Sequence, residues 1–138
     1  MLFLDRKAVE SLLDTEGLVD ALAPAMAELS EGSVSMPQRT GAEVRERDAA
    51  LLVMPGYLPS TGTLATKLVS VFPGNEGTAP PSHHAVMVVF DSDTGVPAAV
   101  MDAAYLTEAR TAAGSALATH LLARPDASIM TVLGTRVQ

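Results

Sequence analysis

A lysine lies in the middle of a run of residues that is typical of a buried strand. In the segment from Thr63 to Val71, the alternation of an extended chain places Lys67 on the same face as Ala65 and Val69. Two interpretations stay open. Lys67 is either an edge-strand lysine whose stem lies on apolar surface while its ammonium reaches water, or a cation that faces a bound substrate.

Two arginines carry a similar signal. Arg110 lies in an Ala-rich segment, where helical spacing places it on one stripe with Leu106 and Leu117. It either pairs with Glu108 or another carboxylate of the chain, or offers its planar set of five donors to a carboxylate or phosphate of a ligand. Arg39 comes two positions after a proline, which restricts the backbone there. A solvated arginine explains it equally well, and only the other two cations favour a ligand role.

The histidines do not predict a metal site. His83 and His84 are neighbours in a segment that we expect to be extended, so their side chains point to opposite faces and cannot share one ion. The chain has no cysteine, which excludes a disulfide, a thiol nucleophile and a thiolate metal site. We therefore expect no metal, and the lack of cysteine is consistent with a cytoplasmic protein.

The last residues resemble the opening of a dinucleotide-binding unit. The run from Ile129 to Leu133 predicts a strand, and Gly134 would make the tight turn that follows it. Arg136 occupies the position of the second glycine, where a long side chain should obstruct the approach of a pyrophosphate. This segment alone therefore does not establish nucleotide binding.

The elements that must position these residues are helices and antiparallel strands. Capping residues and apolar periodicity predict three helices, from Asp5 to about Leu13, from Thr15 to Gly32 and from Asp102 to about Ala123. Apolar runs between turn residues predict four strands, Ala49 to Met54 (ended by Pro55-Gly56), Thr63 to Phe72, His84 to Asp91 and Val96 to Met101. The pattern predicts an α+β fold with a largely antiparallel sheet and helices on it.

Composition limits the classes of function. The 138 residues are 48% hydrophobic, which is enough for one packed domain, and only 4% are aromatic, so the core must rely on small and aliphatic residues. The net charge of −7 disfavours nucleic acid or an anionic membrane as a partner. Charge appears at the fifth residue and no apolar run approaches about 20 residues, so we expect neither a signal sequence nor a membrane anchor.

Five segments, in this order and spacing, resemble the ornithine cyclodeaminase/μ-crystallin family: Met36-Pro37-Gln38-Arg39, Thr66-Lys67-Leu68-Val69, Pro81-Ser82-His83, Asp91 through Asp102, and Arg110 through Ala116. Members of that family join a dimerising domain to a Rossmann domain and use NAD or NADP to oxidise amino acids or reduce cyclic imines. The resemblance implies a substrate-binding and dimerisation domain over residues 1–125. It implies the first strand and phosphate-loop start of an incomplete Rossmann domain over residues 126–138.

The resemblance also implies roles for single residues. Arg39, Lys67 and Arg110 match positions that hold the substrate α-carboxylate, and Lys67 matches a proton donor near the reacting carbon–nitrogen bond. Four residues match positions that touch the nucleotide from the first domain, namely Ser82, His83, Arg110 and Thr111. Val137 and Gln138 match the end of the phosphate loop Gly-x-Gly-x-Gln, from which Arg136 departs.

These matches predict an NAD(P)-dependent oxidoreductase or deaminase acting on an amino acid or a cyclic ketimine, as a homodimer. The Ser82-His83 pair beside Arg110-Thr111 resembles the imine-reducing μ-crystallin branch slightly more than the ornithine branch. Hydride transfer needs a nicotinamide held at the reacting carbon, so we expect the 138 residues to be inactive by themselves. The alternative is a non-enzymatic module for dimerisation or for binding small carboxylates.

Overall fold

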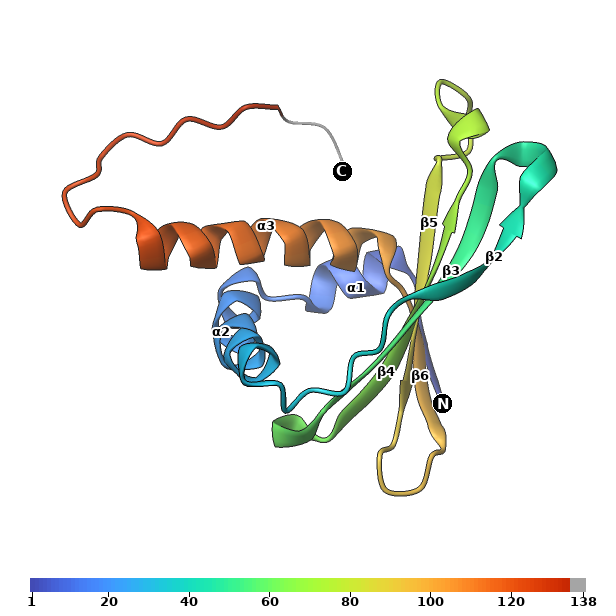
Figure 1. Cartoon of the computed structure of the whole chain (residues 1–138), viewed down its shortest axis with the longest axis horizontal. Coiled ribbons are helices and arrows are strands. Elements are labelled where there is room, and N and C mark those ends of the chain that lie inside the picture. Colours follow the sequence, from blue (N-terminus) through green and yellow to red (C-terminus); the bar gives the residue numbers. More distant parts are fainter. Residues whose placement is uncertain (135–138) are drawn as a thin grey trace.

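The computed structural model describes residues 1–134 as one six-stranded sheet with helices on one of its faces (Figure 1). The strands are β1 (Leu2–Leu4), β2 (Thr40–Val44), β3 (Ala49–Leu58), β4 (Thr63–Val71), β5 (His83–Phe90) and β6 (Pro97–Asp102). The helices are α1 (Arg6–Leu12), α2 (Thr15–Glu31) and α3 (Ala104–Leu122). Short 3-10 helices cover Arg45–Arg47, Pro59–Thr61 and Pro73–Asn75.

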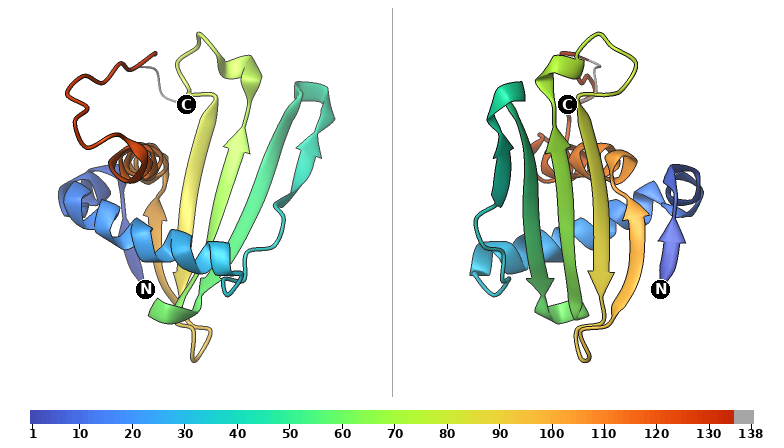
Figure 2. Two further views of the ribbon diagram at one scale, coloured as in Figure 1. Left: turned by 60° about the vertical axis from the view of Figure 1, so that its left-hand side comes forward. Right: turned by 90° about the vertical axis from the view of Figure 1, so that its right-hand side faces the viewer.

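The predicted α+β class is confirmed. The strand order is β1-β6-β5-β4-β3-β2, and every neighbouring pair is antiparallel except β1 and β6. Strand β1 was not predicted, because three residues are too short to show alternation and their partner lies almost a hundred residues further along the chain. Both side views in Figure 2 place the helices on one side of the sheet, which leaves the opposite face uncovered.

Strand β3 runs through the Pro55-Gly56 pair that we expected to end it. The backbone N–H of Tyr57 donates to the carbonyl oxygen of Ser35 at 2.9 Å, so it points away from β4. Residues two apart in a strand direct their backbone nitrogens to the same side, and the nitrogen of Pro55 therefore also points away from β4. The pairing of β2 with β3 ends at Val53, so proline costs no hydrogen bond of the sheet at this position.

The three predicted helices are confirmed, and side chains explain where α1 and α2 begin. The third helix begins at Ala104, with Ala103 rather than the predicted Asp102 as its N-cap. The Asp5 carboxylate accepts a hydrogen bond from the Ala8 N–H at 2.8 Å and caps α1, and Asp14 caps α2 in the same way. Gly32 ends α2 in the left-handed conformation, with φ of 77°, and turns the chain toward Arg39. Asp102, the last residue of β6, accepts from the first backbone N–H groups of α3 at 3.2 and 3.4 Å.

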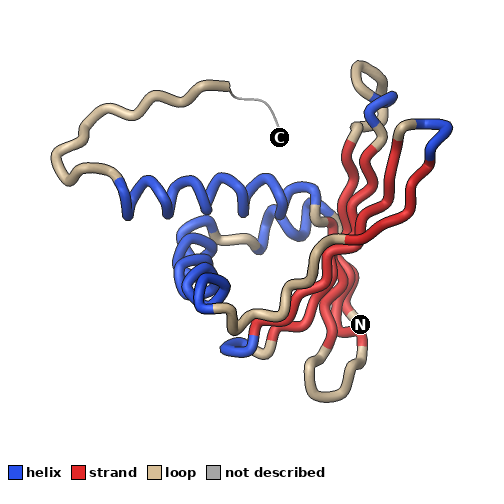
Figure 3. Tube along the Cα trace, viewed as in Figure 1, coloured by secondary structure: helices blue, strands red, loops and turns tan. Residues whose placement is uncertain are grey.

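The strand predicted from Ile129 to Leu133 is absent. The chain from the end of α3 to Gly134 contains turns but neither helix nor strand, and Figure 3 draws it as a loop that passes over α3. A strand needs a neighbouring strand to take its backbone hydrogen bonds, and this segment has none beside it in the described part of the chain. Its apolar side chains are largely exposed, with Ile129 at 89% and Leu133 at 91%.

Candidate functional site

A cavity of about 1000 Å³ lies between the helix-covered face of the sheet, α2 and α3. Its walls come from α2, the connecting segment Val34–Arg39, strands β3, β4 and β5, and the beginning of α3. The lining residues are Met26, Leu29, Val34, Met36, Pro37, Gln38, Arg39, Met54, Pro55, Gly56, Tyr57, Leu58, Thr63, Ala65, Lys67, Met87, Leu106, Thr107 and Arg110. Segments distant in the sequence therefore share one cavity.

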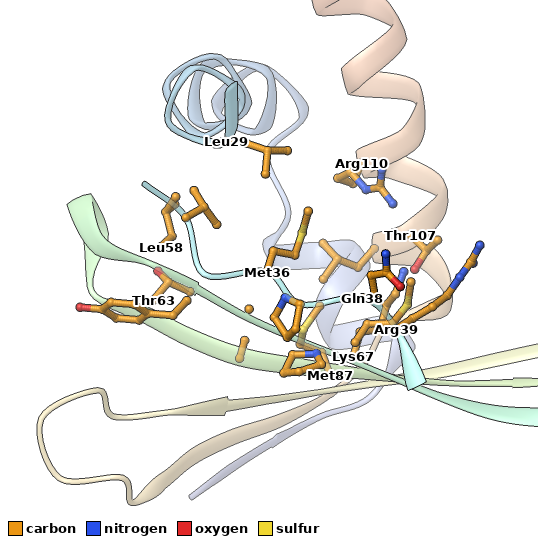
Figure 4. Close-up of a pocket in the computed structure, with 18 of the residues that line it drawn as sticks. Leu29, Met36, Gln38, Arg39, Leu58, Thr63, Lys67, Met87, Thr107 and Arg110 are labelled. Carbon is orange, nitrogen blue, oxygen red and sulfur yellow. The ribbon is translucent and has the colours of Figure 1, made fainter. Parts of the chain in front are cut away.

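The cavity brings together the three cations singled out from the sequence. Lys67 comes from the middle of β4, Arg110 from the second turn of α3, and Arg39 from the segment that leads into β2. The close-up shows all three side chains around one end of the cavity (Figure 4). The Lys67 side chain is half-buried, whereas Arg39 and Arg110 are exposed at its rim.

The structure does not support the two interpretations without a ligand, namely an edge-strand position for Lys67 and an internal ion pair for Arg110. Strand β4 lies between β3 and β5, so Lys67 is not on an edge strand. Glu108 lies 3.8 Å from Arg6, and none of the ion pairs found within residues 1–134 includes Arg110, Lys67 or Arg39. The three cations thus have no counter-charge from the described part of the chain.

Burial changes the acid–base character of Lys67. Removal of the ammonium from water lowers its pKa below the ordinary value, and the positive charge of Arg110 lowers it further. Both effects disfavour the charged lysine while the cavity holds no anion. A carboxylate near Lys67 would act in the opposite direction, because an opposite charge at short range favours the ammonium.

Neighbouring strands place two methionines beside Lys67. Met54 of β3 and Met87 of β5 are its direct partners in the sheet, so both side chains share its face and line the cavity. Thr107 lies one turn before Arg110 on α3, but its hydroxyl already donates to the Ala103 carbonyl oxygen at 2.6 Å. Sequence reasoning missed these residues, because only the strand register and the helix packing bring them to the site.

Of the six residues predicted to touch a nucleotide, Arg110 lines the cavity and three others lie outside it. Ser82 and His83 stand at the start of β5, where the Ser82 hydroxyl lies 3.0 Å from the His83 Nδ1 atom. Thr111 follows Arg110 on α3, and its hydroxyl donates to the Thr107 carbonyl oxygen at 2.7 Å. None of the three lines the cavity. The other two predicted contacts, Val137 and Gln138, fall outside the residues that the structure describes.

Residues 1–134 hold neither a cluster of metal ligands nor a helix that could span a membrane. No group of three or more His, Cys, Asp or Glu side chains lies close enough together there to hold a metal ion. No helix in that range has both the length and the apolar character needed to cross a membrane. The charged groups at the cavity are two guanidinium groups and one ammonium, set among mostly apolar residues.

Comparison with known sequences places this arrangement in a family. The family model described as "Ornithine cyclodeaminase/mu-crystallin family" matches residues 1–138. Ketimine reductase mu-crystallin of Mus musculus is 39% identical over 140 residues, which cover 99% of this chain and 45% of that protein. Alanine dehydrogenase of Archaeoglobus fulgidus is 34% identical over 137 residues, covering 99% and 41%.

Solved structures of amino-acid and imino-acid reductases and dehydrogenases also match this chain. Δ1-pyrroline-2-carboxylate reductase of Thermococcus litoralis, in complex with NADH and L-proline, matches with a TM-score of 0.84 and 37% identity over 91% of this chain and 39% of that chain. An archaeal alanine dehydrogenase dimer with bound NAD matches with a TM-score of 0.84 and 34% identity, over 93% and 39%.

The chain spans less than half the length of these relatives. The relatives reported above are named as reductases and dehydrogenases of amino and imino acids, and both solved structures contain NADH or NAD. The family resemblance found in the sequence motifs is confirmed. The chain belongs to the ornithine cyclodeaminase/mu-crystallin family.

Proposed function

We propose that this chain supplies the substrate-binding and dimerising part of a cytoplasmic NAD(P)-dependent enzyme that acts on an amino acid or a cyclic imino acid. In this proposal, residues 1–125 form that domain and residues 126–138 begin the dinucleotide-binding domain. The observation that supports it most directly is the convergence of Arg39, Lys67 and Arg110 on one cavity with no carboxylate among its lining residues.

The three cations would form a clamp for the substrate carboxylate. A guanidinium offers two parallel N–H donors to the two carboxylate oxygens. Arg39 and Arg110 extend into the cavity from two different elements and could each bind the carboxylate in this way. Lys67, from strand β4, would add a third charge-assisted contact. The lowered pKa of Lys67 also makes its proton easier to transfer, which suits a proton donor at the reacting carbon–nitrogen bond.

NAD or NADP would supply or accept the hydride when bound. The described residues could supply only a few contacts to the nucleotide. Ser82, His83 and Thr111 offer polar atoms, and Gly134 has the left-handed φ of 88° that suits a tight turn. The residues that follow Gly134 lie outside the described range. We propose that turnover requires a complete dinucleotide-binding domain.

The uncovered face of the sheet suits a second copy of the chain. Alternation places Val86 and Leu68 on the face opposite Lys67, and they are direct partners on β5 and β4. Leu51 and Val86 on this face are 45% and 40% exposed. An apolar sheet face of this kind is usually buried, and burial between two identical faces would produce a symmetric homodimer.

A non-enzymatic module that binds carboxylates is the second candidate. The position of Arg136 in the glycine turn of the sequence favours it, because a long side chain there opposes the approach of a pyrophosphate. Turnover of a cyclic imine with NADH or NADPH by the protein, together with micromolar binding of the nucleotide, would rule this candidate out.

The clamp is tested by Lys67→Met in the complete protein. Charge-assisted hydrogen bonds contribute about 1.5 to 3 kcal/mol, so we expect substrate affinity to fall by at least about tenfold. Lys7→Met changes the only other lysine, on the exposed side of α1, and should leave affinity unchanged. A loss of less than about 0.5 kcal/mol for Lys67→Met would show that the proposed contact is wrong.

The electrostatic coupling of the clamp is tested by Arg110→Met. Removing the guanidinium removes one of the two causes that lower the Lys67 pKa, so that pKa should rise, while burial keeps it below the ordinary value. Carboxylate binding needs the charged form of Lys67, so the affinity that remains should decline with rising pH at a higher pH than in the parent. NMR titration of the lysine ε-carbon measures the change, with Arg124→Met as the control. An unchanged Lys67 pKa would contradict the proximity of the two cations.

The homodimer is tested by sedimentation of the protein and of Val86→Glu. A carboxylate in the middle of the uncovered face should be buried without a partner in the dimer, so this variant should sediment as a monomer. Val96→Glu makes the same change in the exposed turn before β6 and should leave the dimer intact. A stable parent monomer at working concentration would contradict the proposed dimer.

A further inference from the structure

The cavity is longer than a carboxylate needs. Thr63, Ala65 and Lys67 line it at two-residue intervals along β4, and an extended chain rises about 3.4 Å per residue, so this wall is about 14 Å long. Figure 4 shows Leu29, Leu58 and Thr63 at the end away from Lys67 and Arg110. A ligand whose carboxylate contacts the cations can therefore extend its remaining atoms toward α2 and the β3–β4 turn.

The two ends of the cavity differ in chemistry. Away from the cations the walls are mostly apolar, with Leu29 from α2, Met36 from the connecting segment, and Leu58 from β3. Methionine side chains are flexible and adapt to apolar groups of different shape. Every charged residue that lines the cavity is a cation, and no aspartate or glutamate lines it.

This distribution of charge discriminates between substrate side chains. An apolar side chain would gain from leaving water, with an affinity increase of about fourfold for each buried methylene group. A second ammonium would lose its hydration, find no carboxylate among the described lining residues, and meet the repulsion of the three cations.

We propose that this cavity selects carboxylates whose side chain is aliphatic or aromatic and disfavours those with a second positive charge. The inference rests on the proposed function, because the carboxylate clamp sets the orientation of the ligand. It assigns the substrate to the apolar amino and imino acids rather than to diamino acids. The end formed by Leu29, Leu58 and Thr63 determines this specificity.

The test compares two ligands of the same length that differ only at their far end, heptanoate and 6-aminohexanoate. Titration of the protein by NMR or calorimetry should show that heptanoate binds at least tenfold more tightly. Hexanoate should bind about fifteenfold more tightly than butanoate, since it buries two more methylene groups. Equal affinities for heptanoate and 6-aminohexanoate, with both still weakened in Lys67→Met, would overturn the inference and leave the clamp intact.

A variant of the far end locates the discrimination. Leu29 is 39% exposed, so α2 should tolerate a polar side chain at this position. Leu29→Glu should improve the binding of 6-aminohexanoate relative to heptanoate by at least tenfold. Leu29→Gln has the same shape without the charge and should keep the preference of the parent within about threefold. An unchanged preference in folded Leu29→Glu would overturn the inference that the side chain extends toward α2.

Failure of the proposed function gives a different pattern. If neither ligand binds, or if Lys67→Met leaves the affinity for both unchanged, the clamp itself is wrong and the inference fails with it. Circular dichroism of each variant, compared with the parent, separates a loss of binding from a loss of structure.

Discussion

Three positive charges lie around one cavity, and no carboxylate of the described chain lines it. Lys67 is half-buried near Arg110, and both burial and repulsion oppose its charged form. Such an arrangement costs free energy in the absence of a ligand, and an anionic group of a ligand would offset that cost. The rest of the domain is arranged so that these charges stay together.

The sheet and the helices hold each cation by a separate means. Strand β4 is flanked on both sides, so the backbone of Lys67 is fixed by β3 and β5. The carboxylate of Asp102, at the end of β6, accepts hydrogen bonds from the first residues of α3 and so fixes the start of the helix that carries Arg110. Gly32 ends α2 in a left-handed conformation and directs the chain toward Arg39. The helices all lie on one side of the sheet, and the other side is the face on which we propose that a second copy binds.

The sequence predicted the cations and the major elements because these signals are local. A lysine inside an apolar strand pattern and an arginine inside an apolar helical stripe are visible without a structure, as is the cap at Asp5. The lining from α2 and β5 could not be predicted in the same way. Met87 faces the cavity beside Lys67 only because β4 and β5 pair in one register, which sequence periodicity does not determine.

The two wrong strand predictions also arise from interactions between segments distant in the sequence. Pro55 was expected to end a strand, but its nitrogen points away from β4 at a position that β2 does not reach, and the strand continues. Ile129 to Leu133 has the composition of a strand, but no neighbouring strand lies beside it. In both cases the outcome depended on which backbone groups had partners, and that information is long-range.

The central claim is that Arg39, Lys67 and Arg110 hold the carboxylate of the substrate. A crystal structure of the complete protein with NAD(P) and a cyclic imino acid or its amino-acid product tests it most directly. We expect carboxylate oxygens within about 3 Å of nitrogen atoms of all three side chains, with the remaining atoms of the ligand directed toward Leu29. A carboxylate bound outside this cavity, with the three cations left in contact with water, would contradict the account.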